Sequence, residues 1–337
     1  MILAGDIGGT KANFGLFVPN GTGLKSIAQR TFHTKEYPSL EKMIDAFLSD
    51  KKEVISSASF GIAAPIVDGR SNSPNIPWSV STADLRRQLN ISQVALINDL
   101  QAMALGITVL PEESFVLLKE GSADPQGCRG VIAAGTGLGE AALIWTPASG
   151  EARQGRPTGY RVLPSEGGHG DFAPRSELEI ELLRYLLRKF NHASYERVLS
   201  GPGLVNIYHF LKEYRKAVEP AWLTDELASR DAGEVITDMA LSERDPICGE
   251  AVDLFGSIYG AEASNMALNF LATGGIYLGG GIAPKILPRL KAGGFVKAFT
   301  DKGRLASLLN RIPVRVIMDT RAPLFGAAQN ALNHQAN

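Results

Sequence analysis

Cysteine is nearly absent from this sequence, because only Cys128 and Cys248 occur among 337 residues. The two lie far apart in the chain, and no CxxC pair exists. This argues against a structural zinc site and against a disulfide framework, since both need clustered or numerous cysteines. Isolated cysteines are typical of reduced thiols in an intracellular protein, so we expect a cytoplasmic location.

An excess of charge of either sign is also missing. Basic residues number 34 and acidic residues 35, which gives a formal net charge of -1 and a sequence pI of about 6.5. No stripe of basic residues marks the chain. Because proteins that bind nucleic acid usually carry such a stripe, we expect no nucleic-acid partner.

Long apolar runs are lacking as well. The most apolar region, residues 263–284, is interrupted by Ser264, Asn265, Asn269, Thr273 and five glycines. A transmembrane helix needs about 20 predominantly apolar residues. The opening stretch MILAGDIGGT also lacks the charged start and apolar core of a signal peptide. We therefore expect neither a membrane span nor export.

What remains is an ordinary globular composition with abundant glycine. Hydrophobic residues make up 45% and charged residues 20%, and the length suits two domains. The 36 glycines form discrete clusters at 8–9, 135–139, 167–170 and 279–281. Separate clusters indicate separate tight backbone sites rather than low complexity.

Two of these clusters sit inside similar patterns. The stretches ILAGDI and KANFGLFV flank GGT, and GVIAAGTGLGEAALIW repeats a strand, a glycine turn and a strand. Each is followed by alternating helices and strands, which predicts a duplicated α/β unit with a ligand in the cleft between the halves. We expect a small domain of residues 1–110 plus 319–337 and a large domain of residues 111–318.

The first glycine turn has the residues of an anion site. Gly8 and Gly9 let backbone amides approach a phosphate closely, and Thr10 adds a hydroxyl donor. Asp6, at the end of the preceding strand, is a candidate for holding Mg²⁺ through water. The pattern is neither GxxxxGK[ST] nor GxGxxG. A plain glycine hairpin is the alternative.

The second turn repeats this chemistry with Gly135, Thr136 and Gly137. Two such turns at matching places in two repeats are what a polyphosphate held from both sides requires. After a later buried strand, the run Gly279–Gly281 permits close approach of a flat ring such as adenine to the backbone.

Asn98 and Asp99 end an apolar strand where a helix begins. Asn and Asp are favoured N-cap residues, so a helix cap is one interpretation. The other is catalytic: the carboxylate of Asp99 takes a proton from a substrate hydroxyl while Asn98 holds a neighbouring hydroxyl. The residues alone leave both open.

The stretch LPSEGGHGDFAP places Glu166, His169 and Asp171 within six positions, and Glu196 follows further on. A metal site is disfavoured, because a third imidazole is missing and the spacing is not that of HExxH on a helix. Carboxylates and an imidazole on a glycine-rich loop suit a polyhydroxylated ligand. A solvated loop is the alternative.

Taken in chain order, seven stretches resemble those of bacterial glucokinases of the non-zinc group. The resemblance extends from residue 2 to about residue 330, and its specific parts are SEGGHGDFAP and ERVLSGPGL; the other stretches are GDIGGTKANFGLF, LINDLQAMALGI, AAGTGLGEA, YLGGGIAP and LFGAAQNAL. That group belongs to the hexokinase, actin and sugar-kinase superfamily. The resemblance implies two ribonuclease H-like (actin-like ATPase) domains with an interdomain cleft.

The resemblance also implies a reaction, the phosphorylation of D-glucose at O6 by ATP with Mg²⁺. Asp99 would be the general base, and Asn98 would hold the 3- and 4-hydroxyls. Glu166 and His169 would bind hydroxyls around C1 to C3, with Glu196 near the anomeric end. Asp6 would organise Mg²⁺, and Asp171 would anchor the loop. The nucleotide would contact Gly8, Gly9 and Thr10, then Gly135, Thr136 and Gly137, and on the adenosine side Gly279, Gly280 and Gly281.

Two residues complicate the nucleotide site. Lys11 adds a cation to the first turn, and Glu140 places an acid directly after the second unless its strand position turns it away. A kinase of another hexose or of an amino sugar, and a non-catalytic sugar-sensing actin-like protein, remain alternatives. A homodimer is the expected assembly.

Overall fold

The computed structural model describes residues 1–21, 23–72, 76, 78–147 and 159–335. Close contacts divide the chain into two units. The first unit comprises residues 1–114, 143–163 and 319–337, and the second unit comprises residues 115–142 and 164–318. The ranges predicted from the sequence differ from this division at residues 111–114 and 143–163. By close contacts residues 143–163 group with the first unit, whereas the sequence prediction places them in the large domain.

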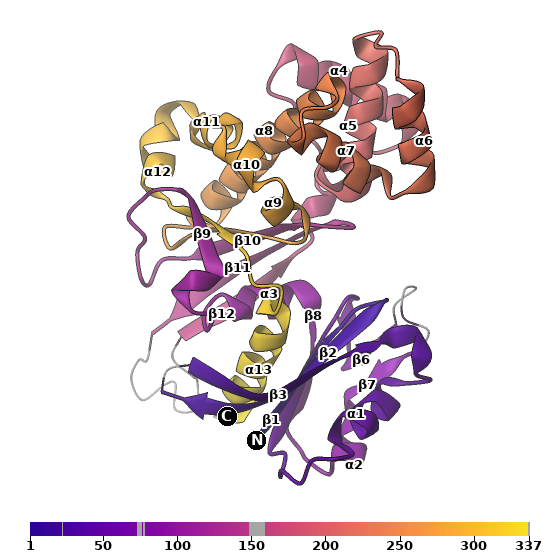
Figure 1. Cartoon of the computed structure of the whole chain (residues 1–337). Helices are drawn as coiled ribbons and strands as arrows, with labels where there is room; N and C mark the ends of the chain where they lie inside the picture. Colours follow the sequence, from indigo (N-terminus) through magenta and orange to yellow (C-terminus); the bar gives the residue numbers. More distant parts are fainter. Residues whose placement is uncertain (22, 73–75, 77, 148–158, 336–337) are drawn as a thin grey trace. The chain divides into compact units, whose positions relative to one another are not determined.

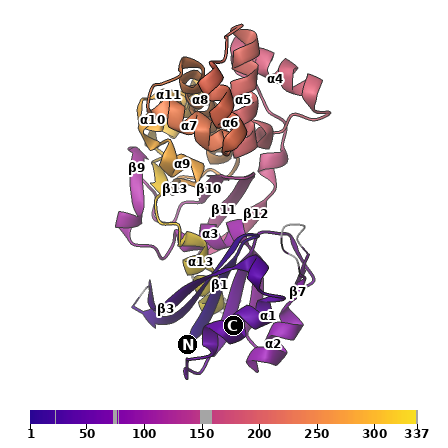
Figure 2. The ribbon, with the colours of Figure 1, turned by 45° about the vertical axis from the view of Figure 1, so that its right-hand side comes forward.

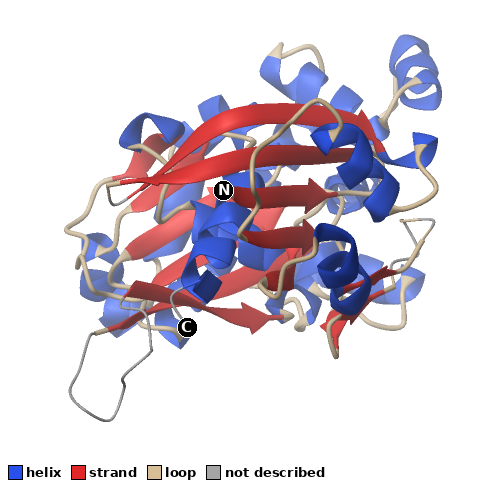
Figure 3. Cartoon of the chain, turned by 90° about the horizontal axis from the view of Figure 1, so that it is seen from below, coloured by secondary structure: helices blue, strands red, loops and turns tan. Residues whose placement is uncertain are grey.

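A five-stranded sheet forms the centre of the first unit. Its order is β3-β2-β1-β4-β8, and β1 runs parallel to β4 and β4 parallel to β8, whereas β2 and β3 are antiparallel additions. The strands, red in Figure 3, are β1 (Ile2–Ile7), β2 (Lys11–Asn20), β3 (Gly23–His33), β4 (Ser57–Ile62) and β8 (Val94–Asn98). The predicted hairpin around GGT is β1–β2.

Helices cover both faces of this sheet (Figure 1). On one face, α1 (Leu40–Leu48) and α2 (Thr82–Leu89) pack apolar side chains against Phe14 and Phe60. Ser39 caps α1 by accepting from the Lys42 N–H. On the other face lie α3 (Asp99–Gly106) and α13 (Ala322–Gln335). Three two-residue strands form a small separate sheet: β5 (Ile66–Val67), β6 (Arg70–Ser71) and β7 (Val80–Ser81).

The backbones of α3 and α13 touch where glycines replace side chains. A Cβ atom on Gly326 would collide with the carbonyl oxygen of Ala102, and one on Gly106 would collide with that of Ala322. Further along α13, the Asn330 amide donates to the buried Ser59 hydroxyl of β4 at 3.0 Å. The last helix of the chain is therefore part of the first unit and holds α3 in place.

The second unit contains a six-stranded sheet of order β12-β11-β10-β13-β14-β9. Its first five positions repeat the order of the first sheet, with β10–β11 in the place of the β1–β2 hairpin and parallel β13 and β14 in the places of β4 and β8. The predicted α/β class with a duplicated unit is confirmed. The strands are β9 (Phe115–Lys119), β10 (Arg129–Ala134), β11 (Leu138–Thr146), β12 (Gly159–Ser165), β13 (Gly275–Gly279) and β14 (Val314–Ile317).

A helical layer packs on this sheet (Figure 2). Its centre is α8, whose buried Tyr259 hydroxyl donates to the Ile132 carbonyl of β10 at 2.9 Å. The helices are α4 (Glu177–Lys189), α5 (Gly201–Tyr214), α6 (Ala221–Ser229), α7 (Ala232–Leu241), α8 (Pro246–Asn269), α9 (Ile282–Lys285), α10 (Leu287–Lys291), α11 (Gly294–Thr300) and α12 (Ala306–Arg311). Among the described residues, no helix is long and apolar enough to cross a membrane.

The capping box at the start of α4 is only half formed. Ser176 does cap α4 by accepting from the Glu179 N–H at 3.3 Å. The Glu179 carboxylate, however, accepts from the backbone N–H of Arg175 at 2.7 Å and from the guanidinium of the same residue at 2.8 Å. The buried acid therefore takes a charged partner in place of the Ser176 N–H. Cys128 and Cys248 are both free thiols.

Candidate functional site

The first glycine turn joins β1 to β2 and is fixed from behind. The Gly8 N–H donates to the Lys11 carbonyl at 2.9 Å, and the fully buried Thr34 donates its hydroxyl to the Gly8 carbonyl at 2.7 Å. Thr10 and Lys11 are exposed. The turn thus leaves the Thr10 hydroxyl and the Lys11 ammonium group available to a ligand.

Asp6 lies half-buried near the end of β1. Its register partner in β2 is Asn13, which donates from Nδ2 to the Asp6 carboxylate at 3.1 Å and is itself oriented by the Thr31 hydroxyl. Burial raises the pKa of Asp6, the hydrogen bond from Asn13 lowers it, and the charge of Asp99 raises it. The net result is a pKa of about 6. Burial thus destabilises the ionised form of Asp6 more than the hydrogen bond from Asn13 stabilises it. A bound cation would stabilise that ionised form.

Asn98 is the N-cap of α3, so its helix-cap interpretation is confirmed. Its Oδ1 accepts from the Leu100 N–H at 2.9 Å, and the Gln101 side chain returns a bond to the Asn98 N–H at 3.2 Å. Nδ2 makes one long contact of 3.4 Å with the Ala64 carbonyl. The helix cap therefore engages Oδ1 of Asn98. The N–H group of Nδ2 is the part of the side chain that can donate to a ligand.

Asp99 is the first residue of α3 and lies at the same edge of the sheet as Asp6. The two strands that carry these acids flank β4, where Gly61 pairs with Asp6 on one side and Ile97 on the other. A Cβ atom on Gly61 would lie 2.9 Å from the Ala102 Cβ and 3.8 Å from the Asp99 Cα. Because Gly61 has no side chain, α3 can pack close enough for Asp99 to influence the charge of Asp6.

In the second unit, the turn of Gly135, Thr136 and Gly137 joins β10 to β11. The Gly135 N–H donates to the Gly137 carbonyl at 2.9 Å, and the Gly135 carbonyl accepts from Gly201 at 2.8 Å. Gly201 begins α5, whose N-cap is Ser200. The second turn is therefore anchored on the start of a helix, a place where backbone N–H groups favour anions.

Glu196 is attached to the same turn. Its carboxylate accepts the Leu138 N–H at 3.1 Å, and a Cβ atom on Gly137 would lie 2.5 Å from that carboxylate oxygen. Gly137 is glycine here because Glu196 needs the space. Predicted only as a sugar contact, Glu196 also ties the second turn to the short 3₁₀ helix Tyr195–Arg197.

The third glycine run lies beside the second turn. Gly280 has a φ of 80°, and a Cβ atom there would collide with the carbonyl oxygen of Ala134. Gly279 pairs with Ala133 in the sheet, whereas Gly281 is exposed and has open space around it. Of the three predicted adenosine contacts, Gly279 is buried, Gly280 is half-buried and Gly281 is exposed.

A cavity of about 900 Å³ lies in the second unit. Three predicted nucleotide contacts line it, namely Gly135, Thr136 and Gly281. The starts of α5 and α7 also reach it, through Gly201 and Gly233. Sequence reasoning missed other residues of its wall, among them Lys189, Arg197, Asn206, Asp231, Thr237 and Lys285. Most of them lie on separate helices, α4, α5, α7 and α9, and no local pattern in the sequence says which helices meet.

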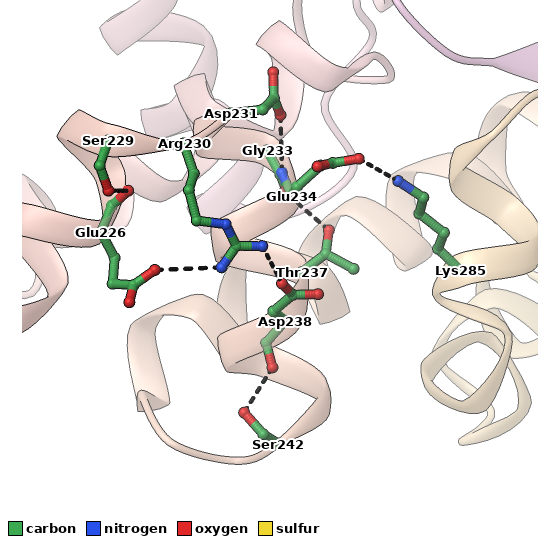
Figure 4. A network of polar contacts seen from close by, with 10 residues as sticks. All are labelled: Glu226, Ser229, Arg230, Asp231, Gly233, Glu234, Thr237, Asp238, Ser242 and Lys285. Atoms are coloured by element: carbon green, nitrogen blue, oxygen red, sulfur yellow. Dashed lines mark hydrogen bonds and ion pairs between the residues drawn. The ribbon is translucent and has the colours of Figure 1, made fainter.

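Polar contacts order the start of α7 at this cavity (Figure 4). Asp231 caps the helix by accepting from the Glu234 N–H at 2.9 Å, and Thr237 donates to the Gly233 carbonyl at 2.8 Å. Lys285 pairs with the Glu234 carboxylate at 2.7 Å, and both side chains are half exposed. Such an exposed pair adds little stability. Its effect is to place one cation and one anion at fixed positions in the wall.

The EGGH stretch is more ordered than the sequence predicted. Gly167–His169 forms a single 3₁₀ turn, with the His169 N–H donating to the Glu166 carbonyl at 3.0 Å. The Glu166 carboxylate lies 3.9 Å from His169 Nε2, and both side chains are exposed. The glycine-rich loop expected from the sequence is thus a short 3₁₀ turn. Among the described residues, no three His, Cys, Asp or Glu side chains are grouped closely enough to hold a metal.

The glycines of this turn are required by packing. A Cβ atom on Gly168 would collide with the Leu138 carbonyl, and one on Gly167 would collide with the Glu140 carboxylate, 3.0 Å from its Cδ. The turn is therefore pressed against β11. This contact, rather than flexibility, is what presents Glu166 and His169 together.

Asp171 holds the far end of the same segment. Its carboxylate lies 2.6 Å from Nε2 of His192, and a backbone bridge joins it to Ser194. The carboxylate is therefore already engaged, in keeping with the anchoring role expected for Asp171. His192 is exposed.

Two comparisons with known proteins bear on this arrangement. The family model described as Glucokinase matches residues 3–334. A glucokinase of Nostoc punctiforme is 41% identical over 343 residues, which cover 97% of this chain and 98% of the relative. The chain belongs to the glucokinase family. It is thus a sugar kinase that phosphorylates glucose.

Solved structures agree with the fold. The crystal structure of a glucokinase from an Antarctic psychrotroph matches 99% of this chain and 98% of its own, with a TM-score of 0.85 and 30% identity. A ROK-family glucokinase from Streptomyces griseus, in complex with glucose and AMPPNP, matches 98% of this chain and 99% of its own at 21% identity and a TM-score of 0.62. The two sheet-rich units are therefore those of the actin-like ATPase fold, as predicted.

Proposed function

We propose that the protein transfers the γ-phosphoryl group of ATP to O6 of D-glucose, with Asp99 as the general base. The observation that carries this proposal is the position of Asp99. It lies in the first turn of α3, at the same sheet edge as Asp6 and the first glycine turn. A general base must reach the hydroxyl proton while the phosphates are held nearby.

The cavity of the second unit supports ATP as the donor. Its volume, about 900 Å³, falls in the range of small-molecule sites. Lys189, Arg197 and Lys285 supply positive charge to its wall, and α5 and α7 begin there. These features favour an anionic nucleotide. We assign Gly135, Thr136 and Gly137 to phosphate, and Gly281, with Gly279 and Gly280 supporting it, to adenosine.

Magnesium fits the first unit through Asp6. Oxygen ligands and retained waters are what Mg²⁺ prefers, so one carboxylate is enough protein contribution. The raised pKa of Asp6, caused first by burial, indicates a negative charge that a cation would stabilise. When bound, Mg²⁺ would neutralise charge on the phosphates. Gly8, Gly9 and Thr10 would contact the phosphates at the same turn.

For the sugar we assign Asn98, Glu166, His169 and Glu196. The cap geometry makes Asn98 a donor through Nδ2, so it would bind sugar oxygens and not sugar hydroxyl protons. The Glu166 and Glu196 carboxylates can only accept, and His169 can do either. Such a set recognises neighbouring hydroxyls of a hexose.

The decisive variant is Asp99→Asn. It keeps a side-chain oxygen for the Leu100 N–H, which Asp99 accepts at 2.9 Å, but removes the base. We expect kcat to fall by at least about 10²–10⁴-fold while KM for glucose stays within a few-fold. Asp50→Asn, on the exposed surface of the same unit, is the control. A near-normal kcat for Asp99→Asn would remove Asp99 from the mechanism.

Specificity needs a separate measurement. A coupled assay with glucose, mannose, fructose and N-acetylated sugars distinguishes a strict glucokinase from a broader hexose or amino-sugar kinase. Absence of turnover with every sugar, combined with glucose binding, would favour a sugar sensor instead. The homodimer and the cytoplasmic location stay predictions, which light scattering and cell fractionation test.

A further inference from the structure

Glu140 is a buried acid with no place in the chemistry described above. Its side chain belongs to a residue that is only 5% exposed, and its Oε1 has no hydrogen-bond partner. The sequence left open whether it faces the second phosphate turn. The structure shows that the Glu140 side chain instead contacts Glu262 of α8, a residue that is only 6% exposed.

Two buried carboxyl groups side by side cannot both be ionised at low cost. Burial, and then the charge of Glu262, raise the pKa of Glu140 to about 8, and burial likewise raises the pKa of Glu262. A carboxylic acid can donate a hydrogen bond to a carboxylate, whereas two carboxylates can only repel each other. At neutral pH the pair therefore holds one proton and is joined by it.

Other groups around the pair favour charge on Glu262 rather than on Glu140. Asn265 donates to the Glu262 carboxylate at 2.8 Å, and the Tyr195 hydroxyl hydrogen-bonds to it as well. Lys302 donates to Asn265 Oδ1 at 2.6 Å and attracts Glu262 electrostatically, while Arg175 and Asp301 act on Lys302. On the other side, the charge of Glu140 acts on the buried Tyr259 hydroxyl. The proton thus belongs on Glu140.

This pair underlies the segments that carry the second unit's candidate glucose contacts. The Glu140 carboxylate fills the space where a Gly167 side chain would lie, directly after Glu166. Tyr195, bonded to Glu262, directly precedes Glu196. Two residues before Glu140, the Leu138 N–H donates to the Glu196 carboxylate.

We propose that Glu140 is a positioning residue for glucose binding, which with Glu262 forms a proton-sharing carboxyl pair that supports the Glu166–His169 turn. This inference rests on the proposed glucose contacts of Glu166, His169 and Glu196. Loss of the shared proton places two like charges beneath the turn and displaces it. Affinity for glucose therefore falls at alkaline pH.

The test measures the Kd of glucose by calorimetry, without nucleotide, from pH 6.5 to 9.5. If only the protonated pair holds the turn, the Kd of the wild-type protein rises by up to about tenfold between pH 7 and pH 9, in proportion to the lost protonated fraction. Glu140→Gln keeps a donor toward Glu262 and cannot ionise. Its Kd should match the wild-type value at pH 7 and stay flat to pH 9.5.

Steric contact gives a second, independent readout. Gly167→Ala should weaken glucose binding, because the new methyl group meets the Glu140 carboxylate. Glu140→Ala should weaken it at every pH, because Glu262 loses its donor and the turn loses its support. In the double variant the methyl group occupies vacated space, so the two effects should be clearly less than additive. Full additivity would contradict the contact.

Failure of this inference is separable from failure of the proposed function. His169→Ala should abolish most glucose affinity if the sugar assignment is right. If it does, and Glu140→Gln keeps the wild-type pH profile, the carboxyl pair has no role in binding. If His169→Ala binds glucose normally, the assigned sugar site is wrong, and the positioning role assigned to Glu140 is wrong with it.

Discussion

The carboxyl groups of Asp6 and Asp99 lie at the same edge of the first sheet, near enough that ionised Asp99 disfavours ionisation of Asp6. Burial is the larger cause, and together they raise the pKa of Asp6 to about 6, although Asn13 donates a hydrogen bond to it. The proposed base and the proposed magnesium ligand are therefore coupled by charge. Ionisation of Asp6 is unfavourable in the folded protein until a cation binds to its carboxylate.

This coupling predicts an exchange of stability for function at Asp6. With a pKa of about 6 when folded and 3.8 otherwise, the folded protein holds the proton more tightly. Ionisation therefore destabilises the fold as pH rises from about 4 to 6, by up to about 3 kcal/mol if one pKa unit corresponds to about 1.4 kcal/mol. Asp6→Asn removes this cost.

We expect Asp6→Asn to melt at a higher temperature than the wild-type protein at pH 8 in EDTA, with the difference shrinking toward pH 4. Activity with Mg²⁺ and ATP should fall sharply. Differential scanning calorimetry across this pH range and steady-state kinetics measure the two effects. A lower melting temperature for the variant at pH 8 would show that the Asp6 charge is stabilised in the folded state.

Asn98 is predicted to have two separable roles. Asn98→Ala removes the cap of α3, which costs about 1 kcal/mol, and also removes the amide donor proposed for the sugar. Asn98→Ser keeps a capping oxygen but loses the amide N–H group of Asn98 Nδ2. Both variants should raise KM for glucose, and only Asn98→Ala should lower the melting temperature. Ser39→Ala, which removes the cap of α1, should lower it without changing KM.

Gly280 and Gly281 should respond very differently to alanine. At Gly280 the φ of 80° disfavours any side chain, and the methyl group would meet the Ala134 carbonyl. We expect Gly280→Ala to cost about 1–2 kcal/mol from the backbone alone, and more from the collision. Gly281 has open space, so Gly281→Ala should fold normally. Thermal unfolding decides this, and equal stability of the two variants would contradict it.

Filling the cavity of the second unit should affect ATP selectively. A Cβ atom on Gly233 would lie 3.3 Å from Oδ1 of Asp231, so a leucine there fits once that side chain moves by a few tenths of an ångström. Its side chain would occupy space in the cavity that Gly233 lines. We expect Gly233→Leu to raise KM for ATP at least tenfold while glucose still binds. Ala228→Leu, on exposed α6, is the control.

Local patterns in the sequence predicted the elements that depend on neighbouring residues. Alternation around glycines predicted both hairpins, β1–β2 and β10–β11. Asn98 and Asp99 were located because a strand ends and a helix begins there. Such features are short-range, so the sequence displays them directly.

Features that depend on distant residues were not predictable. The EGGH turn becomes helical because β11 supports it from below, through Leu138 and Glu140. Glu140 finds its partner, Glu262, 122 residues later, in a helix that carries two other acids, Glu250 and Asp253. The glycine run that contains Gly280 suggested a ring-binding surface, yet at Gly280 it is the nearby Ala134 carbonyl that leaves no space for a side chain. No local pattern reports which distant backbone will be near.

The glycine contact between α3 and α13 has a consequence for biosynthesis. Gly326 and Gly106 join the last helix of the chain to the helix that begins with Asp99. The ribosome makes proteins from the N-terminus, and domains generally fold as units as they emerge. The second unit, complete at Met318, has its whole chain available before the first. The first unit therefore completes its chain after the second, and the helix that carries the proposed base gains its packing partner only after α13 has been made.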